Sequence, residues 1–313
     1  MALKEIRFDG RVVVVTGAGS GLGRAHAMEF ARRGARVLVN DPGGDVRGQG
    51  GDGGIADRVV REIRSAGGQA IADHHSVGTP EGAKLAIQTA IDAWGRIDVL
   101  VNNAGILRDK TLAKMDLHDF DHVVRVHLGG SAYCTQAALP HMQGAGYGRI
   151  VMTTSSAGLY GNFGQSNYGA AKLGIVGLMN SLKHETAKFN ILVNTVAPVA
   201  VTRMTEGMAF ANLIEIATPE RVTPAVVFLA SDHCTFTGEI VAAGGNYFSR
   251  VQIVEAEGVH VPQEETPTAE WVAANWPAIA DMSGARTFES AMAALDGQFK
   301  ALEPEPGDTG VGS

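Results

Sequence analysis

Residues 11–23 have the sequence RVVVVTGAGSGLG, in which a run of β-branched residues leads directly into a glycine-rich turn. The continuous apolar run at 11–16 predicts a strand that is buried on both faces of a sheet. Residues 22–33 have a helical pattern, and Gly34 would cap the end of that helix. Together these residues predict a strand, a turn and a helix of the kind from which α/β domains are built.

The same alternation continues to about residue 245. Repeated strand–helix units predict a doubly wound parallel sheet with helices on both faces and right-handed connections. Residues 43–54 (GGDVRGQGGDGG) interrupt the rhythm, and their glycine content predicts a mobile loop. Further strands are expected at 36–40, 69–73, 97–102, 149–154, 191–197 and 239–243, and further helices at 55–66, 79–94, 116–142 and 165–188.

The pattern changes beyond Arg250. Residues 268–281 and 287–300 predict two helices, the first of which carries Trp271 and Trp276. We therefore expect a single α/β domain at residues 1–250, with a C-terminal helical extension at 251–303 packed on it. Residues 304–313 have a composition that favours disorder.

Composition excludes several classes of protein. The 313-residue chain has a net charge of −7, which gives no basic footprint, so no nucleic-acid partner is expected. Two cysteines, Cys134 and Cys234, are too few for a disulfide framework and favour a reducing, cytoplasmic location. No run approaches ~18 apolar residues, so no membrane span is predicted. His74 and His75 lack partners at a suitable spacing, so no metal site is predicted.

The glycine-rich turn at residues 16–23 (TGAGSGLG) would bring the backbone close to a diphosphate at a helix N-terminus. Asp41 ends the second strand, where a carboxylate accepts hydrogen bonds from both ribose hydroxyls of a dinucleotide and repels an added 2′-phosphate. These features favour NAD over NADP. The alternative is that Asp41 is a turn residue before Pro42, which is compatible with the same role.

Tyr168 and Lys172 are four residues apart on a predicted helix, so they share one face. A nearby ammonium group would lower the pKa of the phenol and let Tyr168 act as an acid or base. Ser155, at the end of a strand, could hold the oxygen of a substrate. Taken alone, this spacing is more often an ordinary helix with a surface lysine.

The chain resembles the short-chain dehydrogenase/reductase family because it carries four motifs in the order typical of that family: the glycine-rich turn, Asn102-Asn103-Ala104-Gly105, Ser155 and the Tyr168–Lys172 pair. The resemblance implies a Rossmann-type fold. A narrower resemblance covers roughly residues 7–300. Its motifs, at 8–11, 40–45, 103–109, 160–165 and 268–276, are similar to the (3R)-hydroxyacyl-CoA dehydrogenase part of peroxisomal multifunctional enzymes, also classed as 17β-hydroxysteroid dehydrogenases. Hydratase and sterol-carrier segments are absent, so we expect a free-standing bacterial homologue.

The resemblance implies an NAD-dependent enzyme that interconverts a secondary alcohol and a ketone. Ser155 would orient the substrate oxygen, Tyr168 would exchange the proton, and Lys172 would lower the tyrosine pKa and bind the nicotinamide ribose. A homodimer or homotetramer is the family expectation. The implied cofactor contacts are Gly17, Ser20, Gly21, Leu22, Gly23, Asp41, Ser76, Val77, Asn103, Ala104, Gly105, Tyr168, Lys172, Pro198, Ala200 and Thr202.

The chain departs from the family pattern at three places. His127 takes the position of the usual fourth catalytic residue, Asn, where it could support a proton relay or simply be a packed histidine. Pro198-Val199 replaces the usual Pro-Gly after the sixth strand. His75 replaces the acid commonly found before the adenine, so no adenine carboxylate is expected there.

The favoured substrate is a (3R)-hydroxyacyl-CoA, by resemblance. A steroid alcohol is the alternative substrate, and a non-catalytic NAD-binding regulatory protein is the alternative of another class, opposed by the intact Ser155, Tyr168 and Lys172. Arg108, Asp109 and Lys110 could meet a CoA phosphate or form a solvated loop. The apolar residues Met204, Met208 and Phe210 could cover a substrate or form a small packed helix.

Overall fold

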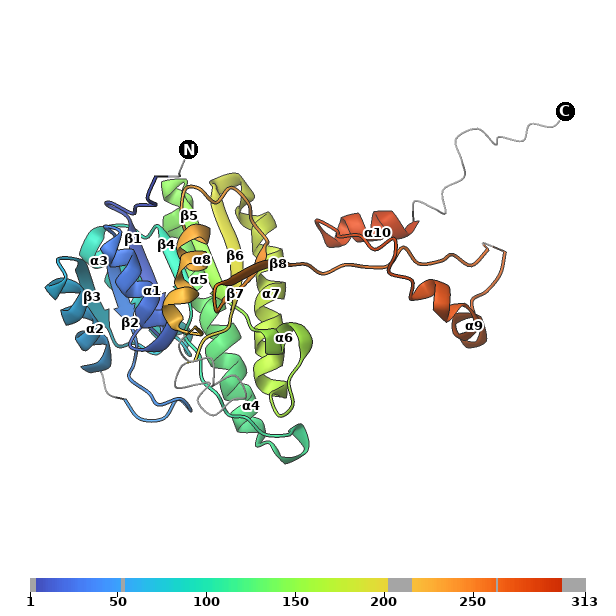
Figure 1. The fold of residues 1–313 in the computed structure, drawn as a ribbon, viewed down its shortest axis with the longest axis horizontal. Coiled ribbons are helices and arrows are strands. Elements are labelled where there is room, and N and C mark those ends of the chain that lie inside the picture. The colour runs from blue at the N-terminus through green and yellow to red at the C-terminus, as the bar shows by residue number, and fades with distance from the viewer. Residues whose placement is uncertain (1–3, 52–53, 202–215, 263, 300–313) are drawn as a thin grey trace. The chain divides into compact units, whose positions relative to one another are not determined.

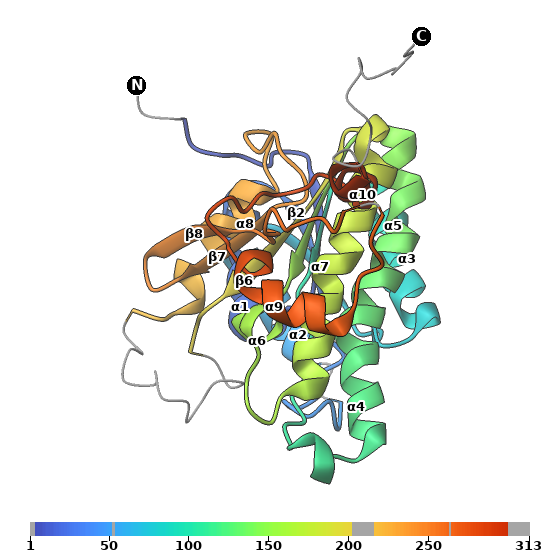
Figure 2. The same ribbon diagram turned by 90° about the vertical axis from the view of Figure 1, so that its right-hand side faces the viewer.

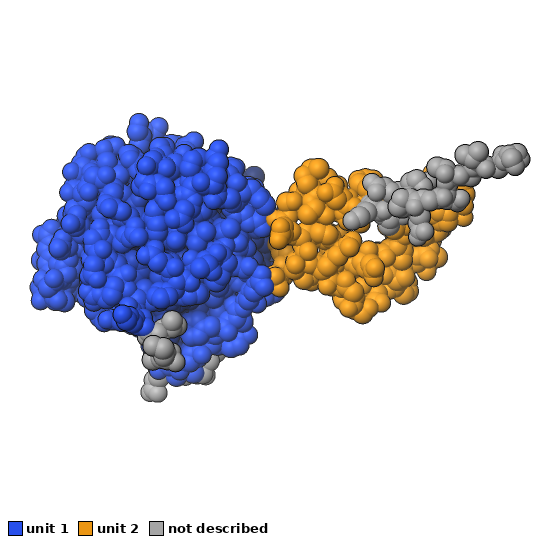
Figure 3. Space-filling view, turned by 90° about the horizontal axis from the view of Figure 1, so that it is seen from above, with its two compact units in different colours: residues 1–251 blue, residues 252–313 orange. Residues whose placement is uncertain are grey.

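The computed structural model describes residues 4–51, 54–201, 216–262 and 264–299. The chain divides into two compact units, residues 1–251 and 252–313, which are coloured separately in Figure 3. Thr202, Met204, Met208 and Phe210 lie outside the described residues. The packing of the extension on the main domain stays a prediction.

The first unit contains one eight-stranded sheet with the order β3-β2-β1-β4-β5-β6-β7-β8 (Figure 1). Seven strands are parallel, and β8 pairs antiparallel with β7. This confirms the predicted α/β class. The strands are β1 (Val12–Thr16), β2 (Arg36–Asn40), β3 (Gln69–Asp73), β4 (Val99–Asn102), β5 (Gly148–Thr153), β6 (Ile191–Pro198), β7 (Ile240–Gly244) and β8 (Tyr247–Val251).

Helices cover both faces of the sheet, as Figures 1 and 2 show. The described helices are α1 (Gly21–Arg32), α2 (Gly54–Ser65), α3 (Pro80–Trp94), α4 (Leu117–Val124), α5 (Gly130–Ala145), α6 (Ser156–Tyr160), α7 (Ser166–Thr186) and α8 (Thr223–Leu229), with α9 (Ala269–Ile279) and α10 (Ala291–Phe299) in the second unit. Short 3-10 turns lie at Leu112–Lys114, Ala187–Phe189 and Pro219–Arg221, and a π-helical turn lies at Arg125–Gly129. No helix in the described part of the chain is long and apolar enough to cross a membrane.

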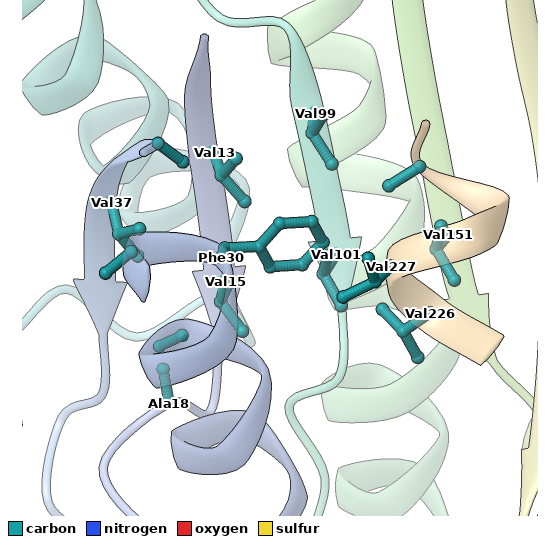
Figure 4. Packing of buried hydrophobic residues seen from close by; sticks show 14 of the residues in the cluster. Val13, Val15, Ala18, Phe30, Val37, Val99, Val101, Val151, Val226 and Val227 are labelled. Carbon is teal, nitrogen blue, oxygen red and sulfur yellow. The ribbon is translucent and has the colours of Figure 1, made fainter. Parts of the chain in front are cut away.

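Two hydrophobic cores form because successive side chains of each strand point to opposite faces. Val13 and Val15 of β1 pack with α1, α2 and α8, whereas Val12 and Val14 pack with α3, α5 and α7. Figure 4 shows the first core, in which Phe30 of α1 is fully buried against strand valines and α8. Full burial of such a side chain stabilises the fold by about 1.5–3 kcal/mol.

The structure corrects three details of the sequence-based fold. The edge strand β8 was not expected, and it follows β7 through a two-residue turn in which Gly245 and Asn246 have φ angles of 55° and 67°. Positive φ at both positions is the geometry of a tight hairpin. The single helix predicted at 116–142 is interrupted by the π-helical turn Arg125–Gly129. The short helix α6 was also missed.

Candidate active site

The glycine-rich turn follows β1 at the carboxyl edge of the sheet, where α/β proteins bind ligands. Gly17 and Gly21 have φ angles of 62° and 54°, values that glycine adopts at no steric cost. A Cβ on Gly17 would lie 2.7 Å from the Cα of Ala104, and one on Gly23 would lie 2.2 Å from the carbonyl oxygen of Gly17. Positions 17 and 23 of the turn therefore favour glycine, and the turn leads directly into the N-terminus of α1.

Thr16 and Asn103 hold this turn in place from two neighbouring strands. The Thr16 hydroxyl accepts hydrogen bonds from the backbone N–H groups of Asn103 and Ala104, both at 3.1 Å. The Asn103 side-chain amide donates to the carbonyl oxygens of Thr16 at 3.0 Å and Gly17 at 3.1 Å. Asn103, which was predicted to lie along the cofactor, thus also holds the turn in its conformation.

Asp41 lies beside the turn, immediately after β2. Its Oδ2 accepts a hydrogen bond from Gly19 N at 2.9 Å, and its Oδ1 accepts one from Gly43 N at 2.8 Å. A Cβ on Gly19 would come within 2.8 Å of Asp41 Oδ2, so the close approach requires glycine. The carboxylate is consequently held at the edge of the turn, in the position predicted to recognise a ribose.

Ser155, Tyr168 and Lys172 converge after β5. Ser155 caps the N-terminus of α6, where its hydroxyl accepts from Ala157 N at 3.2 Å, and it hydrogen-bonds with the Tyr168 side chain. The Lys172 Nζ donates to the carbonyl oxygen of Thr153 at 2.7 Å and lies 5.5 Å from the centre of the Tyr168 ring. The fold therefore brings the three predicted catalytic residues together.

The electrostatics of this group differ from the sequence-based expectation. Burial lowers the pKa of Lys172 from 10.5 to about 7. Burial also raises the pKa of Tyr168, an effect opposed by its hydrogen bond with Ser155 and increased by the charge of Asp109. The predicted lowering of the Tyr168 pKa by Lys172 is thus wrong for this structure, because loss of solvent outweighs the favourable contacts.

His127 lies in the π-helical turn and is 1% exposed. Its Nε2 lies 3.0 Å from the N and 2.8 Å from the O of Ile106, while its buried Nδ1 has no hydrogen-bond partner among the described residues. Burial and the charge of Lys172 hold the pKa of His127 well below 6.5. A Cβ on Gly105 would lie 2.2 Å from the ring, so glycine makes room for it. The imidazole is neutral and packed at the site.

One cleft of about 330 Å³ is lined by most of these groups. The predicted residues that line it are Gly17, Ser20, Gly21, Leu22, Asp41, Ser76, Val77, Asn103, Ala104, Gly105, His127, Tyr168, Lys172 and Pro198. Gly23, Ser155 and Ala200 are not among the lining residues. A larger hollow of about 620 Å³ near α1 and α8 contains none of the predicted residues, so it is a poor candidate for the chemistry.

Sequence reasoning missed several lining residues, chiefly Asp45, Val46, Gly48, Ile106 and Thr153. The first three belong to the segment that was predicted to be a mobile loop. Thr153 could have been found from its place at the end of β5, because parallel strands deliver ligand-binding residues at their carboxyl ends.

Other candidates have structural partners. Arg108 donates to Asp119 Oδ1 at 2.6 Å and to the carbonyl oxygen of Arg47 at 2.9 Å, so its side chain is held by protein partners. Contact with a CoA phosphate stays a prediction. His75 Nδ1 lies 2.7 Å from Asp73 Oδ2. Within the described ranges, no cluster of three or more His, Cys, Asp or Glu residues could hold a metal ion.

Comparison with known proteins agrees with this geometry. Residues 11–211 match the family described as short chain dehydrogenase. The chain belongs to that family. As a short-chain dehydrogenase it is an oxidoreductase that acts on CH–OH groups.

Two similar proteins confirm the narrower resemblance. This short-chain dehydrogenase is 49% identical to the peroxisomal multifunctional enzyme type 2 of Mus musculus over 90% of its own length and 38% of the mouse protein. It is similar to the structure of the full-length peroxisomal multifunctional enzyme type 2 from Drosophila melanogaster, with a TM-score of 0.79, 39% identity, and coverage of 95% of this chain and 50% of the other. The chain thus spans half or less of these relatives.

A third similarity includes a bound cofactor. The short-chain dehydrogenase matches a 7α-hydroxysteroid dehydrogenase complexed with NADH and 7-oxo glycochenodeoxycholic acid, with a TM-score of 0.69 and 28% identity. The match covers 76% of this chain and 94% of the other.

Proposed function

We propose that this dehydrogenase oxidises a secondary alcohol to a ketone with NAD as hydride acceptor, and that its substrate is a (3R)-hydroxyacyl-CoA. The observation that carries the proposal is that Asp41, Tyr168 and Lys172 line one cleft, with Ser155 hydrogen-bonded to Tyr168. The lining residues thus include groups suited to a dinucleotide and a group suited to an alcohol oxygen.

The described residues fit NAD. Glycine at positions 17 and 23 lets the turn pack closely against Ala104 and against itself, and Gly17, Ser20 and Gly21 line the cleft. A diphosphate there would meet the N-terminus of α1, whose first backbone N–H groups favour an anion. Asp41 supplies two acceptor oxygens suited to ribose hydroxyls. Ser76 and Val77 border the same cleft beyond β3. NAD would supply the hydride acceptor, and the protein would bind and orient it.

Two side chains, Ser155 and Tyr168, would handle the alcohol. The Ser155 hydroxyl would donate a hydrogen bond to the substrate oxygen. In the oxidation, Tyr168 would first have to lose its own phenolic proton, and its oxygen would then take the alcohol proton as the carbon gives up its hydride. In the reverse direction Tyr168 would return the proton to the ketone oxygen. The burial that raises the pKa of Tyr168 keeps it protonated at neutral pH, so Tyr168 would be ready to act as the acid in ketone reduction.

The substrate proposal is supported by the resemblance to the peroxisomal multifunctional enzymes, which extends over 90% of the chain. We would measure NADH formation by the purified protein with NAD and matched (3R)- and (3S)-hydroxyacyl-CoA. Turnover of the (3R) thioester alone is the expected result. Absence of turnover with both thioesters would overturn the proposed substrate class. Absence of NADH binding by the wild-type protein would overturn the proposed cofactor.

A steroid alcohol is the second candidate, because a structurally similar dehydrogenase holds NADH and an oxidised bile acid conjugate. The same assay should therefore include a 17β-hydroxysteroid. Turnover of the steroid, without activity toward either thioester, would support the proposed roles in proton transfer and would replace the proposed substrate with a steroid alcohol. Equal kinetics with NAD and NADP would contradict the role given to Asp41.

A further inference from the structure

The segment that follows β4 reaches from the glycine-rich turn to the start of the helix that carries Tyr168. Asn103, near the beginning of this segment, holds the turn through its side-chain amide. Asp109, farther along, accepts a hydrogen bond from Nε2 of Gln165 at 2.7 Å. Because Gln165 immediately precedes α7, one stretch of chain contacts both the predicted cofactor turn and the catalytic helix.

Gln165 occupies the N-cap position of α7, but its side chain does not cap the helix. The residue is 4% exposed, so both ends of its amide group need partners. Nε2 donates to Asp109, and Oε1 accepts from Asn162 Nδ2 at 2.8 Å. The backbone oxygen of Gln165 accepts from Gly169 N at 2.7 Å. Asp109 therefore satisfies a buried donor on the residue from which α7 begins.

Two further hydrogen bonds join the same two segments. Lys110 N donates to the carbonyl oxygen of Gly164 at 2.8 Å, and Asn167 Nδ2 donates to the carbonyl oxygen of Arg108 at 3.1 Å. Asn167 is fully buried, and its Oδ1 accepts from the backbone N–H of Tyr168 at 2.8 Å. The start of α7, and with it the backbone of Tyr168, is thus held against the segment after β4.

Asp109 also places a negative charge near the phenol. Burial has the largest effect in raising the pKa of Tyr168, the hydrogen bond with Ser155 opposes it, and the charge of Asp109 raises that pKa further. The other groups that contact or face the phenol ring in the described part of the chain are Lys172 and the neutral His127. A carboxylate disfavours a nearby phenolate, so Asp109 favours the protonated phenol.

The neighbouring cations leave this carboxylate unpaired. Within the described residues Asp109 is in no ion pair, and Arg108 beside it donates to Asp119 instead. Part of Asp109 is exposed to solvent, which screens its charge. Partial burial raises the pKa of its carboxyl group, against the hydrogen bond from Gln165. A carboxyl group is still ionised at the alkaline pH at which a phenol titrates, so the charge is present there but its effect is modest.

We propose that Asp109 is a positioning residue for Tyr168, which holds the start of α7 through Gln165 and acts on the phenol through its charge. The inference rests on the proposed function, in which Tyr168 exchanges the proton with the substrate. Alcohol oxidation requires the phenol to lose its own proton first. The charge of Asp109 should therefore slow oxidation at a given pH and keep Tyr168 ready to protonate a ketone.

The first test is the pH profile of kcat/KM for alcohol oxidation in wild type and in Asp109→Asn. Asparagine keeps an acceptor oxygen for Gln165 Nε2 and removes the charge. We expect the rising limb of the profile to move to lower pH, so that kcat/KM on that limb increases about threefold in D109N. A purely structural role would lower the activity instead.

Asp92→Asn is the matched control for the loss of charge. Asp92 lies on α3, where it is exposed and accepts a hydrogen bond from Gln88 Nε2 at 2.7 Å, as Asp109 does from Gln165. It is not among the charges that act on Tyr168. The profile of D92N should coincide with that of wild type.

Gln165→Met tests the positioning role, because it keeps a long side chain and removes the hydrogen bond to Asp109. We expect kcat to fall about tenfold with little change in KM or in NADH affinity, and Gln88→Met is the control. Thermal unfolding checks that Q165M folds, and the D109N profile decides the inference if it does not. A profile that stays in place in D109N, or a wild-type kcat in folded Q165M, would overturn the inference, while turnover by wild type would still support the proposed function. Absence of turnover by wild type with every alcohol tested would overturn both.

Discussion

The His127 ring lies edge-on to the Tyr168 ring, with centroids 5.1 Å apart and planes at 89°. The two residues come from different elements, since His127 is in the π-helical turn and Tyr168 is in the first turn of α7. The imidazole is buried and neutral, so it supports the phenol by packing, and its buried Nδ1 has no hydrogen-bond partner among the described residues. The π-helical turn thereby contributes directly to the site.

We expect His127→Ala to reduce kcat by about 10-fold to 100-fold, because loss of the ring removes the support that positions Tyr168. His127→Phe restores a ring and should recover much of kcat if packing is the main role. Steady-state kinetics of both variants, with thermal unfolding as a check on folding, distinguish the roles. Equal losses in the two variants would assign the role to the nitrogen atoms instead.

Tyr168→Phe should lower kcat by about 100-fold to 10,000-fold and leave NADH affinity nearly unchanged, because it removes one hydroxyl that carries the proton. The measurement is NADH formation with the best alcohol substrate, paired with direct NADH binding. A loss of cofactor affinity as large as the loss of activity would contradict the acid–base role. Tyr160→Phe is a suitable control, since Tyr160 is 73% exposed and lies at the end of α6.

Lys172 should impose a dependence of stability on pH. Its pKa falls from 10.5 to about 7 on folding, so between these values the unfolded chain binds more protons than the folded chain. The free energy of unfolding of wild type therefore rises as the pH increases from 7 toward 10.5. Below pH 7 the fold carries the full cost of the buried charge.

Lys172→Met removes that cost. We expect K172M to be more stable than wild type at pH 7 by on the order of a few kcal/mol, reduced by the lost hydrogen bond to Thr153 O, and catalytically impaired. The advantage should shrink as the pH approaches 10.5. Urea unfolding of both proteins at pH 7 and 10 provides the measurement. A stability difference that stays constant with pH would show that Lys172 is protonated throughout.

Much of the site could be predicted because its signals are local. The glycine turn, Asp41 and the Tyr168–Lys172 spacing each describe a few consecutive residues, and parallel strands bring such motifs to one edge of the sheet. The hairpin before β8 also had a local signal, the Gly245-Asn246 pair, although it was overlooked.

Other features depend on contacts that are distant in sequence. The glycine content of residues 43–54 gave no sign of the hydrogen bonds by which Leu107 and Arg108, about sixty residues away, donate to the backbone of Val46 and Arg47. The mobility of this segment stays a prediction. The raised pKa of Tyr168 similarly arises from burial, which the spacing of Tyr168 and Lys172 does not reveal. The π-helical turn was hidden inside one continuous helical pattern.

Arg108 connects the loop of residues 42–51 to α4, because its guanidinium donates hydrogen bonds to Arg47 O and to Asp119. We expect Arg108→Gln to weaken NADH binding several-fold, mainly through faster dissociation, because the loop loses an anchor next to the cofactor. Asp119→Asn should weaken NADH binding similarly. Because both substitutions break the same ion pair, the change in binding free energy in the double variant should be smaller than the sum of the two single changes. Arg32→Gln is the control, because Arg32 at the end of α1 forms exposed ion pairs with Glu29 of the same helix and with Glu5 near the N-terminus. Stopped-flow measurement of NADH release checks the prediction, and wild-type release rates in both R108Q and D119N would show that this anchor does not hold the loop over the cofactor.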